Sequence, residues 1–337
     1  MKAFEVTGKR KSCVVEREIP RCGDDDVLLK ITAAGICGTD IHIYEGDYFG
    51  EYPIIPGHEF SGIVESVGKN IKNISIGQRV VSDPNIFCEK CYFCQQNLQN
   101  HCENFQATGV TRDGAFAEFL AVPDSTVFPV SNETILSEEL AFVEPLACCV
   151  YGQKRARPDI GQNVLIFGCG PIGLLHMQLA RRNGAGKIVV VDRNIERLNL
   201  AKELGADEII IANESMDESI RRYNSRGFQM VIDATGIPAV IENEIQYIRN
   251  DGTLLLFGVC GNDQTIKISP YEIFRRDIKI VGSFALRKTF FEALTLIENG
   301  LINVKALIGE VVGMDQMPAA VEKMLNGKTS MKVILKP

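Results

Sequence analysis

The stretch Val164-Leu-Ile-Phe-Gly-Cys-Gly-Pro-Ile-Gly173 decides the fold of this chain. Four apolar residues predict a buried strand, and three glycines with the spacing Gly-x-Gly-x-x-Gly follow it directly. The first glycine permits a tight turn, the second lets the backbone approach a pyrophosphate, and the third lets the next helix pack on the strand. Free N–H groups at the start of that helix face the phosphates. The motif predicts a Rossmann dinucleotide site that includes Gly168, Gly170, Pro171, Ile172 and Gly173.

An acidic residue ends the next expected strand. Asp192 follows Gly173 by 19 residues, and its carboxylate can accept hydrogen bonds from the ribose hydroxyls of adenosine. The same carboxylate would repel a 2′-phosphate, so we expect NAD rather than NADP. Arg193 stands directly after it and could soften this preference, so NADP stays open. The alternative is a Rossmann sheet that binds no nucleotide.

Short apolar runs alternate with stretches of helical periodicity after Gly161. Residues 172–183 and 194–204 have the periodicity of helices. Strands that alternate with helices form a parallel, doubly wound sheet. The six expected strands are residues 164–167, 187–191, 208–211, 230–234, 253–257 and 279–281.

The first 145 residues have a different pattern, with many short strands separated by clusters of Gly, Asp, Asn and Pro. This pattern predicts an antiparallel, barrel-like domain. From about Phe284 the chain holds two helical stretches and a closing strand, residues 332–335, which we expect to return to the first domain. The strands expected in the first part include residues 26–34, 60–67, 79–82 and 115–121.

Four cysteines share one short loop that is rich in Asn and Gln, with the spacing Cys88-x₂-Cys91-x₂-Cys94-x₇-Cys102. Thiolate sulfurs bind tetrahedral Zn²⁺ at about 2.3 Å, and a structural site fills all four positions with protein ligands. A disulfide pair or a redox Cys-x-x-Cys motif is the alternative, but a redox motif uses two cysteines rather than four. The loop therefore predicts a closed structural zinc site without a position for substrate.

A second set of candidate metal ligands is more scattered. Cys37 and His58 stand in the motifs Cys37-Gly-Thr-Asp-Ile-His and Gly-His58-Glu59, and a catalytic zinc needs about three protein ligands and one open position. Glu59 and Glu144 are the candidate carboxylates. An ionised Glu144 inside its apolar stretch is costly unless it is paired or bound to metal. In the alternative, Cys37 is a small buried apolar residue and His58 belongs to a turn.

Length and composition narrow the class of protein. The 337 residues suffice for two domains, and a composition of 45% hydrophobic and 23% charged residues favours neither a disordered chain nor a membrane protein. No apolar run approaches the roughly 18 residues of a spanning helix, and a net charge of -7 disfavours nucleic acid and anionic membranes as partners. The start lacks the apolar core of a signal peptide, and the eleven cysteines form no disulfide framework. We therefore expect a cytoplasmic protein.

In their order along the chain, these motifs resemble the zinc-dependent medium-chain dehydrogenase family. The resemblance covers essentially the whole chain and implies a GroES-like β-barrel catalytic domain (residues 1–145 and 284–337) and an NAD-binding Rossmann domain (residues 146–283), with the active site in the cleft between them. It also implies two zinc ions per subunit, one catalytic and one structural.

Glu144-Pro-Leu is similar to the polyol (sorbitol, L-iditol) dehydrogenase branch of this family. That branch ligates its zinc with Cys, His and Glu plus water. The resemblance therefore implies that Cys37, His58 and Glu59 bind the catalytic zinc, and that Glu144 binds it directly or through water.

The resemblance also implies how the reaction proceeds. The ion would lower the pKa of the substrate alcohol, and hydride would pass to the nicotinamide. Thr39 would accept the proton and pass it through the cofactor ribose to His42 at the surface, although a turn threonine and a solvated histidine would look the same. Arg197 matches an adenosine-side arginine, or is a solvated helix charge. Further cofactor contacts are expected where strands end, at Phe257, Gly258, Val259, Ser283 and Phe284.

The chain departs from sorbitol dehydrogenases at two places. Ile43 stands where they have a tyrosine, and Ala285-Leu286 stands where they have an Arg-Tyr pair for polyol hydroxyls. Arg287 and Lys288, just beyond, could reach the phosphate of a sugar-alcohol phosphate, or form a basic patch that caps a helix. Threonine dehydrogenases share Cys-Gly-Thr-Asp-Ile-His-Ile-Tyr but have Asp-Pro-Phe in place of Glu144-Pro-Leu.

We therefore expect an NAD-dependent zinc enzyme that reversibly oxidises a secondary hydroxyl of a small-molecule polyol to a ketose. A sugar-alcohol phosphate is the alternative substrate, followed by L-threonine or a simple secondary alcohol. A zinc-free quinone reductase relative or a non-catalytic NAD-binding protein would lack ligands or relay residues that are present here. The sheet edge at residues 279–281 could pair across a two-fold axis, and the resemblance implies a homodimer or homotetramer.

Overall fold

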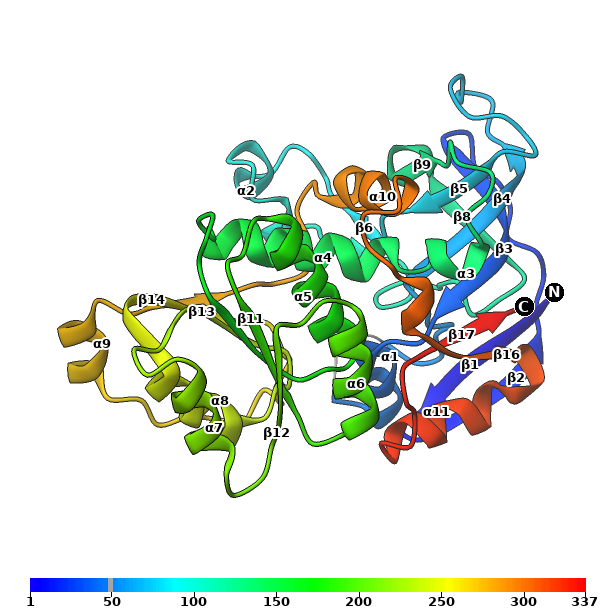
Figure 1. Cartoon of the computed structure of the whole chain (residues 1–337). Helices are drawn as coiled ribbons and strands as arrows, with labels where there is room; N and C mark the ends of the chain where they lie inside the picture. The colour runs from blue at the N-terminus through cyan, green and yellow to red at the C-terminus, as the bar shows by residue number, and fades with distance from the viewer. Residues whose placement is uncertain (48–50) are drawn as a thin grey trace. The chain divides into compact units, whose positions relative to one another are not determined.

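The computed structural model describes residues 1–47 and 51–337, which form two compact units (Figure 1). The first unit comprises Met1–Ala147, Arg287–Gly300 and Val304–Pro337, and the second comprises Cys148–Leu286 and Leu301–Asn303. None of the helices in the described ranges has the length and apolar character that a bilayer crossing requires. The assignment of a catalytic domain to residues 1–145 and 284–337, and of an NAD-binding domain to residues 146–283, remains a prediction at this stage.

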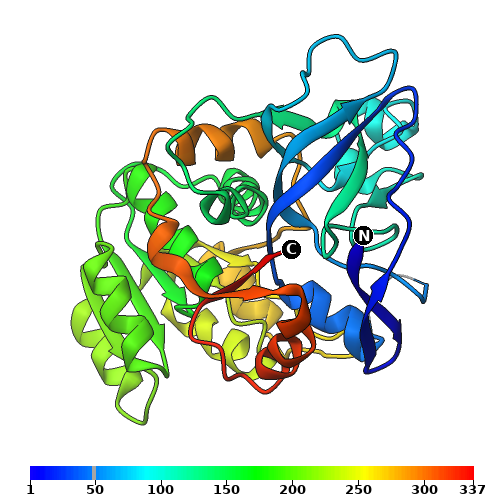
Figure 2. The same ribbon diagram turned by 90° about the vertical axis from the view of Figure 1, so that its right-hand side faces the viewer.

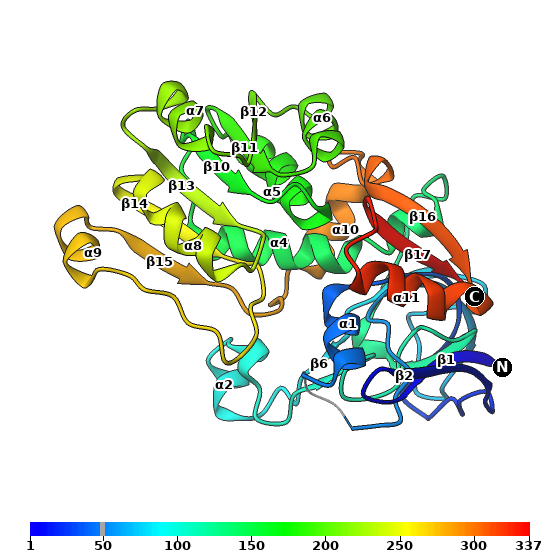
Figure 3. The same cartoon turned by 90° about the horizontal axis from the view of Figure 1, so that it is seen from below.

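The second unit is built on a six-stranded parallel sheet with the order β12-β11-β10-β13-β14-β15. The order reverses between β10 and β13, and ligands of doubly wound sheets bind at the carboxyl ends of the strands at such a point. Helices α5 and α6 lie on one face of the sheet, and α7 and α8 on the other (Figures 1 and 3). The strands are β10 (Val164–Phe167), β11 (Ile188–Asp192), β12 (Glu208–Ile211), β13 (Phe228–Asp233), β14 (Ile248–Leu256) and β15 (Lys279–Gly282). The helices are α5 (Pro171–Arg182), α6 (Ile195–Glu203), α7 (Met216–Tyr223), α8 (Pro238–Glu244) and α9 (Pro270–Arg276).

The predicted parallel, doubly wound sheet is confirmed, and two predicted strands coincide with β10 and β12. The expected start of β14 at residue 253 is wrong, because the strand begins at Ile248. Residues 249–251 are exposed Arg, Asn and Asp, so no apolar periodicity marks them. Ile248 pairs with Phe228 across an irregular register, which places polar residues at the amino edge of the sheet.

The first unit is organised by a sheet of order β16-β17-β3-β4-β5-β9, in which β8 also pairs with β3. All these pairs are antiparallel except β16 with β17, so the expected antiparallel, barrel-like character is confirmed and the parallel pair was missed. Figure 2 shows the red closing strand β17 beside the blue strand β3, where Ile334 pairs with Gly35. The strands are β1 (Lys2–Gly8), β2 (Lys11–Glu16), β3 (Asp26–Gly35), β4 (Glu59–Val67), β5 (Arg79–Ser82), β6 (Asn85–Ile86), β7 (Gln106–Ala107), β8 (Phe119–Pro123), β9 (Val127–Pro129), β16 (Ile308–Gly313) and β17 (Lys332–Lys336). The helices are α1 (Gly38–Glu45), α2 (Tyr92–Gln95), α3 (Ser137–Leu140), α10 (Phe290–Glu298) and α11 (Met317–Leu325), and α4 (Val143–Ala156) runs from the first unit into the second.

The strand predicted at residues 115–121 lies later in the chain, at β8 (Phe119–Pro123). The apolar residues before β8 bond to other partners: the Ala115 amide donates to the Gly57 carbonyl at 2.8 Å, and Ala117 forms an isolated bridge with Ala3. Apolar character alone could not distinguish this loop, which is buried against the chain before β4, from a strand.

One buried acid in the second unit is not balanced by a partner. Glu244, at the end of α8, is fully buried, and neither carboxyl oxygen has a hydrogen-bond partner among the described residues. Burial, and then the charge of Asp233, raises the pKa of Glu244 to about 9. Asp233 is itself held by the amide and hydroxyl of Thr235, at 2.9 and 2.6 Å. Glu244 therefore remains protonated in the folded chain near neutral pH.

This shift makes the stability of the chain depend on pH. Because the pKa of Glu244 is higher in the folded than in the unfolded chain, its favourable contribution is complete below the unfolded value and is lost as pH rises towards about 9. At pH 8 we expect Glu244→Gln to unfold at a higher urea concentration than the parent. Between pH 5 and pH 8, the parent should lose on the order of 2 kcal/mol more of its free energy of unfolding than Glu244→Gln does. The exposed Glu203→Gln is the matched control and should show no such difference. Parallel pH profiles for all three proteins would contradict this assignment.

Candidate active site

Three predicted zinc ligands come together in the first unit. The ligand atoms of Cys37, His58 and Glu59 all lie within 4.8 Å of one another. Cys37 is the N-cap residue of α1, and His58 and Glu59 lead into β4, which pairs with the strand that ends just before Cys37. Thiolate, imidazole and carboxylate together match the donors that Zn²⁺ takes in proteins. Glu144, near the start of α4, lies outside this group of three.

Asp40 holds this cluster in place, a role that its position in the sequence did not reveal. Its carboxylate accepts the Cys37 amide at 2.7 Å and the Gly57 amide at 3.2 Å. It also lies 3.6 Å from Nδ1 of His58, and it is 3% exposed. An acidic residue three positions after an N-cap is a recognisable capping signal. That signal could have identified Asp40, but not its contact with His58.

The buried polar atoms of the cluster fit a bound cation. Nδ1 of His58 is buried without a hydrogen-bond partner among the described residues, which is costly in a protein interior, and Oε2 of Glu59 has the Lys332 ammonium beside it but accepts no hydrogen bond of good geometry. Burial alone would lower the pKa of His58, but Asp40 and then Cys37 raise it well above 6.5 in the metal-free chain. The surrounding anions therefore attract positive charge, which a metal ion can supply in place of the proton.

Lys332 forms a buried ion pair with Glu59. The Lys332 ammonium, on the closing strand β17, donates to Oε1 of Glu59 at 2.6 Å, and the side chains are 7% and 1% exposed. Burial would lower the pKa of Lys332, but the neighbouring Glu59 and Cys37 raise it above 10.5. A Cβ at Gly35 would lie 2.3 Å from Oε2 of Glu59 and 2.9 Å from Cε of Lys332, so a larger residue there would displace the ends of both paired side chains. A lysine inside an otherwise apolar strand gave no clear sign of this role in the sequence.

The two predicted proton-relay residues lie on α1. Thr39 and His42 are three positions apart, which places them on neighbouring turns of one helix face. The Thr39 hydroxyl oxygen lies 3.8 Å from the Cys37 sulfur, at the metal cluster. The His42 ring is 30% exposed, and its Nδ1 lies 3.1 Å from Asp47. One end of this helix face therefore touches the candidate zinc ligands, and the other end meets solvent.

The four cysteines of the predicted structural site also converge. Cys88, Cys91, Cys94 and Cys102 place their sulfurs within 4.8 Å of one another, and none of the eleven cysteines, all of which lie in the described residues, forms a disulfide bond. The sulfurs of Cys91 and Cys102 are 3.9 Å apart, too far for a disulfide bond. All four sulfurs converge on one point instead of forming a bonded pair, and this arrangement fits a closed tetrahedral zinc site.

Local hydrogen bonds prepare this loop for metal. The Cys91 amide donates to the Cys88 sulfur and the Cys88 amide to the Cys102 sulfur, both at 3.4 Å. Main-chain N–H groups, the Lys90 amide first, lower the pKa of Cys88 to about 6, whereas burial raises the pKa of Cys94 to about 12. Phe87, Phe93 and Phe105 cover the cysteines. The apolar contacts of the loop are thus centred on the cysteine cluster.

The glycine turn of the second unit has the geometry that the sequence predicts. Gly168 has φ of +97°, and a Cβ at Gly173 would lie 1.8 Å from the Gly168 carbonyl oxygen, so both positions require glycine. A Cβ at Gly170 would enter open space. Packing within the chain therefore does not require glycine there, whereas a pyrophosphate close to the backbone would. Pro171 is the first residue of α5, and Ile172 follows it.

Asp192 at the end of β11 is tied to this turn. One carboxylate oxygen accepts the Cys169 amide at 2.6 Å, and the other accepts the Asn194 amide at 2.8 Å. Carboxylate oxygens have further lone pairs, so Asp192 can still accept from ribose hydroxyls. Arg197 lies in the first turn of α6, the helix that follows Asp192.

The remaining predicted cofactor residues differ in their surroundings. The Phe257 ring packs edge-on against His176, with centroids 4.3 Å apart, so it is partly a core residue. A Cβ at Gly258 would lie 2.0 Å from the Gly236 amide nitrogen, which explains that glycine by close backbone contact. The Ser283 hydroxyl is buried without a hydrogen-bond partner among the described residues. Val259 and Phe284 are 66% and 46% exposed.

Comparison with known proteins gives two successive family matches, the second of which extends past the second unit into residues 287–299 of the first. Residues 23–132 match the alcohol dehydrogenase GroES-like domain, and residues 171–299 match the zinc-binding dehydrogenases. The chain is 35% identical to D-arabinitol dehydrogenase 1 of Uromyces fabae over 342 residues, covering 100% of this chain and 97% of that relative. It is 33% identical to an L-threonine 3-dehydrogenase of Caldanaerobacter subterraneus subsp. tengcongensis, covering 98% and 96%. A structure from Sinorhizobium meliloti 1021, described as a zinc-binding dehydrogenase bound to NADP, superposes with a TM-score of 0.93 at 32% identity and covers 100% of this chain and 99% of that one.

The two cysteine-containing sites predict separable losses of zinc. We expect the parent to hold about two zinc ions per chain. Cys94→Ser should lower this to about one and reduce the thermal midpoint, because the loop loses the metal that organises it. Cys37→Ser should also lose one zinc and nearly all turnover, yet keep the thermal stability of the cysteine loop. Elemental analysis with thermal unfolding measures both, and exposed Cys13→Ser is the matched control. Two zinc ions in Cys94→Ser would contradict the assignment.

The buried ion pair predicts that substitution of Lys332 strongly lowers the free energy of unfolding. Lys332→Met would leave the Glu59 carboxylate buried without its cation, which typically costs about 3–5 kcal/mol. Lys336→Met, on the same strand, removes an exposed pair with Glu138 and should cost less than about 1 kcal/mol. Urea unfolding of the zinc-loaded protein measures both. The double variant Lys332→Met with Glu59→Gln should recover part of the lost stability. Equal losses for Lys332→Met and Lys336→Met would show that the buried pair contributes no more to stability than the exposed one.

Proposed function

Because the chain belongs to the zinc-binding medium-chain alcohol dehydrogenase family, an oxidoreductase family acting on CH–OH groups with zinc and NAD(P), we propose that it reversibly oxidises a secondary hydroxyl of a polyol to a ketose with NAD. The convergence of Cys37, His58 and Glu59 beside α1 carries this proposal, since it supplies a three-ligand metal site next to a proton path. In this proposal Glu144 is a further ligand, direct or through water.

The reaction removes a hydride and a proton from one carbinol group. Zinc, when bound, supplies Lewis acidity that lowers the pKa of an alcohol. NAD supplies the hydride acceptor. The chain's own residues then handle the proton: Thr39 holds it at Oγ1, and His42 releases it from the exposed end of α1. Asp40 and Lys332 fix the orientation of His58 and Glu59, so that the ligands do not reorganise during turnover.

The proposed class of substrate depends on residues 285–288. Leu286 is fully buried, so it offers no group to a polyol hydroxyl at the position where sorbitol dehydrogenases have one of their polar residues. The Lys288 ammonium lies 3.0 Å from the side-chain oxygen of Gln99 when that amide is oriented to accept from it. Lys288 therefore has a partner on the chain, which supports an unphosphorylated polyol. A sugar-alcohol phosphate bound through Arg287 stays the second candidate.

The similarity to an L-threonine 3-dehydrogenase makes threonine a further candidate. Glu144 in place of the family's aspartate disfavours it, and the D-arabinitol dehydrogenase relative supports a polyol of pentitol size. Asp192 supports NAD as the preferred cofactor, because a carboxylate repels the 2′-phosphate of NADP. The S. meliloti relative was solved with NADP, so this preference is best measured directly.

We also propose that the chain works as a homodimer or homotetramer. Strand β15 is the outer strand of the parallel sheet, and an outer strand leaves main-chain groups available for pairing. Helix α9, which precedes it, exposes Tyr271 and Phe274 at 64% and 79%. Pairing of β15 across a two-fold axis would cover both features.

A substrate screen tests the proposal. NADH formation would be measured with C4–C6 polyols, their phosphates, L-threonine and simple secondary alcohols, before and after chelation and zinc return. We expect an unphosphorylated polyol to have a kcat/KM at least about tenfold above its phosphate and threonine, a difference of about 1.4 kcal/mol in transition-state stabilisation. NAD should exceed NADP in the same assay.

The screen also has clear negative outcomes. Activity on none of these alcohols, or full activity after removal of all metal, would refute the proposal. If a sugar-alcohol phosphate had the highest kcat/KM, the second candidate substrate would replace the first. His42→Ala should retain zinc but lower kcat at low pH relative to the parent, which separates a failed relay from a failed metal site.

A further inference from the structure

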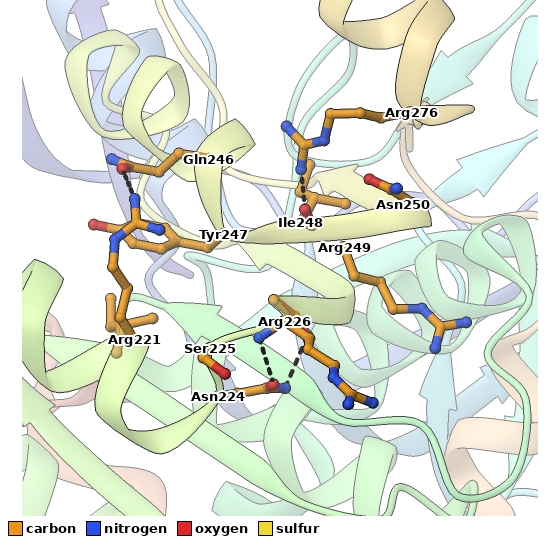
Figure 4. Close-up of a pocket in the computed structure, with 12 residues that line it drawn as sticks. Arg221, Asn224, Ser225, Arg226, Gln246, Tyr247, Ile248, Arg249, Asn250 and Arg276 are labelled. Carbon is orange, nitrogen blue, oxygen red and sulfur yellow. Dashed lines mark hydrogen bonds between the residues drawn. The ribbon is translucent and has the colours of Figure 1, made fainter.

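Four arginines gather around a pocket of about 110 Å³ in the second unit (Figure 4). Arg221 comes from α7, Arg226 from the turn before β13, Arg249 from β14 and Arg276 from the last turn of α9. None of the described residues that line the pocket is acidic. Four like charges around one small cavity repel each other unless an anion lies between them.

Two of these arginines are partly satisfied by the chain. Arg276 is 14% exposed on its side chain, donates to the carbonyls of Ile245 and Ile248, and pairs with Glu272 at 3.6 Å. Arg221 donates to the Gln246 side-chain oxygen at 2.5 Å. These contacts fix the positions of both guanidinium groups at the pocket wall.

The other two arginines have no such contacts. Within the described ranges, the guanidinium groups of Arg226 and Arg249 make no hydrogen bond or ion pair, and both residues are exposed. In Figure 4 their side chains extend in the same direction from adjacent chain segments. The nearby carboxylate of Asp251 is bound to Lys279 at 2.8 Å, and the charge of Arg249 is only a smaller contribution to the lowered pKa of Asp251. Two guanidinium forks are therefore available to one ligand.

The backbone between these two arginines is tightly fixed. A Cβ at Gly227 would lie 2.7 Å from the Tyr247 carbonyl oxygen and 2.9 Å from the Arg249 amide nitrogen, so the turn before β13 rests directly on the start of β14. The Asn224 side chain closes this turn, accepting the Arg226 amide at 3.3 Å and donating to the Gly227 carbonyl at 2.8 Å. Arg226 and Arg249 thus come from a rigid base rather than from a loose loop.

The pocket is remote from the nucleotide turn. It lies at the amino ends of β13 and β14, whereas Gly168 and Asp192 follow or end strands at the carboxyl edge of the same parallel sheet. Its volume is also well below the roughly 300–1,000 Å³ of pockets for drug-sized ligands. A second nucleotide would not fit within it, but a single tetrahedral anion would.

We propose that this pocket binds the phosphoryl group of a small anion, either inorganic phosphate or a phosphate monoester. One planar guanidinium group can donate two parallel hydrogen bonds to phosphate oxygens. Arg226 and Arg249, whose guanidinium groups make no other hydrogen bond to the described residues, supply the direct contacts. Arg221 and Arg276 add positive charge from the wall. This inference does not depend on the reaction or substrate proposed above.

Calorimetric titration of inorganic phosphate tests the proposal. The protein would be loaded with zinc and saturated with NADH, which fills the nucleotide site, and chloride would keep the ionic strength constant. We expect saturable binding that weakens about tenfold or more in the double variant Arg226→Gln with Arg249→Gln. Arg249→Lys should fall between the two, because it keeps the charge and loses the fork. Glycerol 3-phosphate binding more tightly than phosphate would identify a monoester as the ligand, and equal binding would identify phosphate itself.

Arg222→Gln is the matched control. Arg222 neighbours Arg221 on α7, is 74% exposed, pairs with Glu218 at 2.6 Å and does not line the pocket. It should bind phosphate within about twofold of the parent. Thermal midpoints of all variants would show that these exposed substitutions leave the fold intact. No saturable binding, an equal loss in Arg222→Gln, or binding of unphosphorylated glycerol at the same affinity would each overturn the proposal.

Discussion

The buried contact between Glu59 and Lys332 is the constraint on which the first unit depends. It joins residues that are 273 positions apart, and it draws the closing strand β17 against β3 and the start of β4. A buried carboxylate and a buried ammonium tolerate each other only when they are paired. Gly35 is the position where β3 passes both side chains, and a larger residue there would push their charged ends aside. The metal cluster thus depends on the last strand of the chain as much as on its own loop.

The second unit depends on a different kind of constraint, which is steric and local. Gly168 and Gly173 must be glycine because of backbone conformation and close contact, and Asp192 bonds the turn to the end of the next strand. All these contacts lie within about one strand–helix–strand segment. A local constraint of this kind leaves a readable pattern in the sequence, which is why the fold of this unit followed from one short motif.

Long-range contacts explain what the sequence could not reveal. The convergence of Cys37, His58 and Glu59, and that of the four cysteines, was predictable because the chemistry of zinc limits the residue types. Asp40 and Lys332 were missed because their roles exist only after distant segments meet: Asp40 touches residues on both sides of the β3–β4 connection, and Lys332 comes from the other end of the chain. The start of β14 was missed for a related reason. After the buried Ile248, its next three residues are polar and exposed at the amino edge of the sheet, so they carry no apolar pattern.

The charges of the metal cluster show why a lysine belongs there. Cys37 as thiolate, Glu59 and Asp40 bring three negative charges into a nearly closed region, and His58 is neutral when it serves as a ligand. A divalent ion offsets two of these charges, and Lys332 offsets the third. Leaving aside Glu144, which the proposal adds as a further ligand, the formal charge of this set is then zero, and buried groups stay ionised in a low-dielectric interior when their charges are balanced in this way. Without Lys332 the set would carry a net negative charge, so the same three ligands would hold a cation more strongly and activate a bound alcohol less.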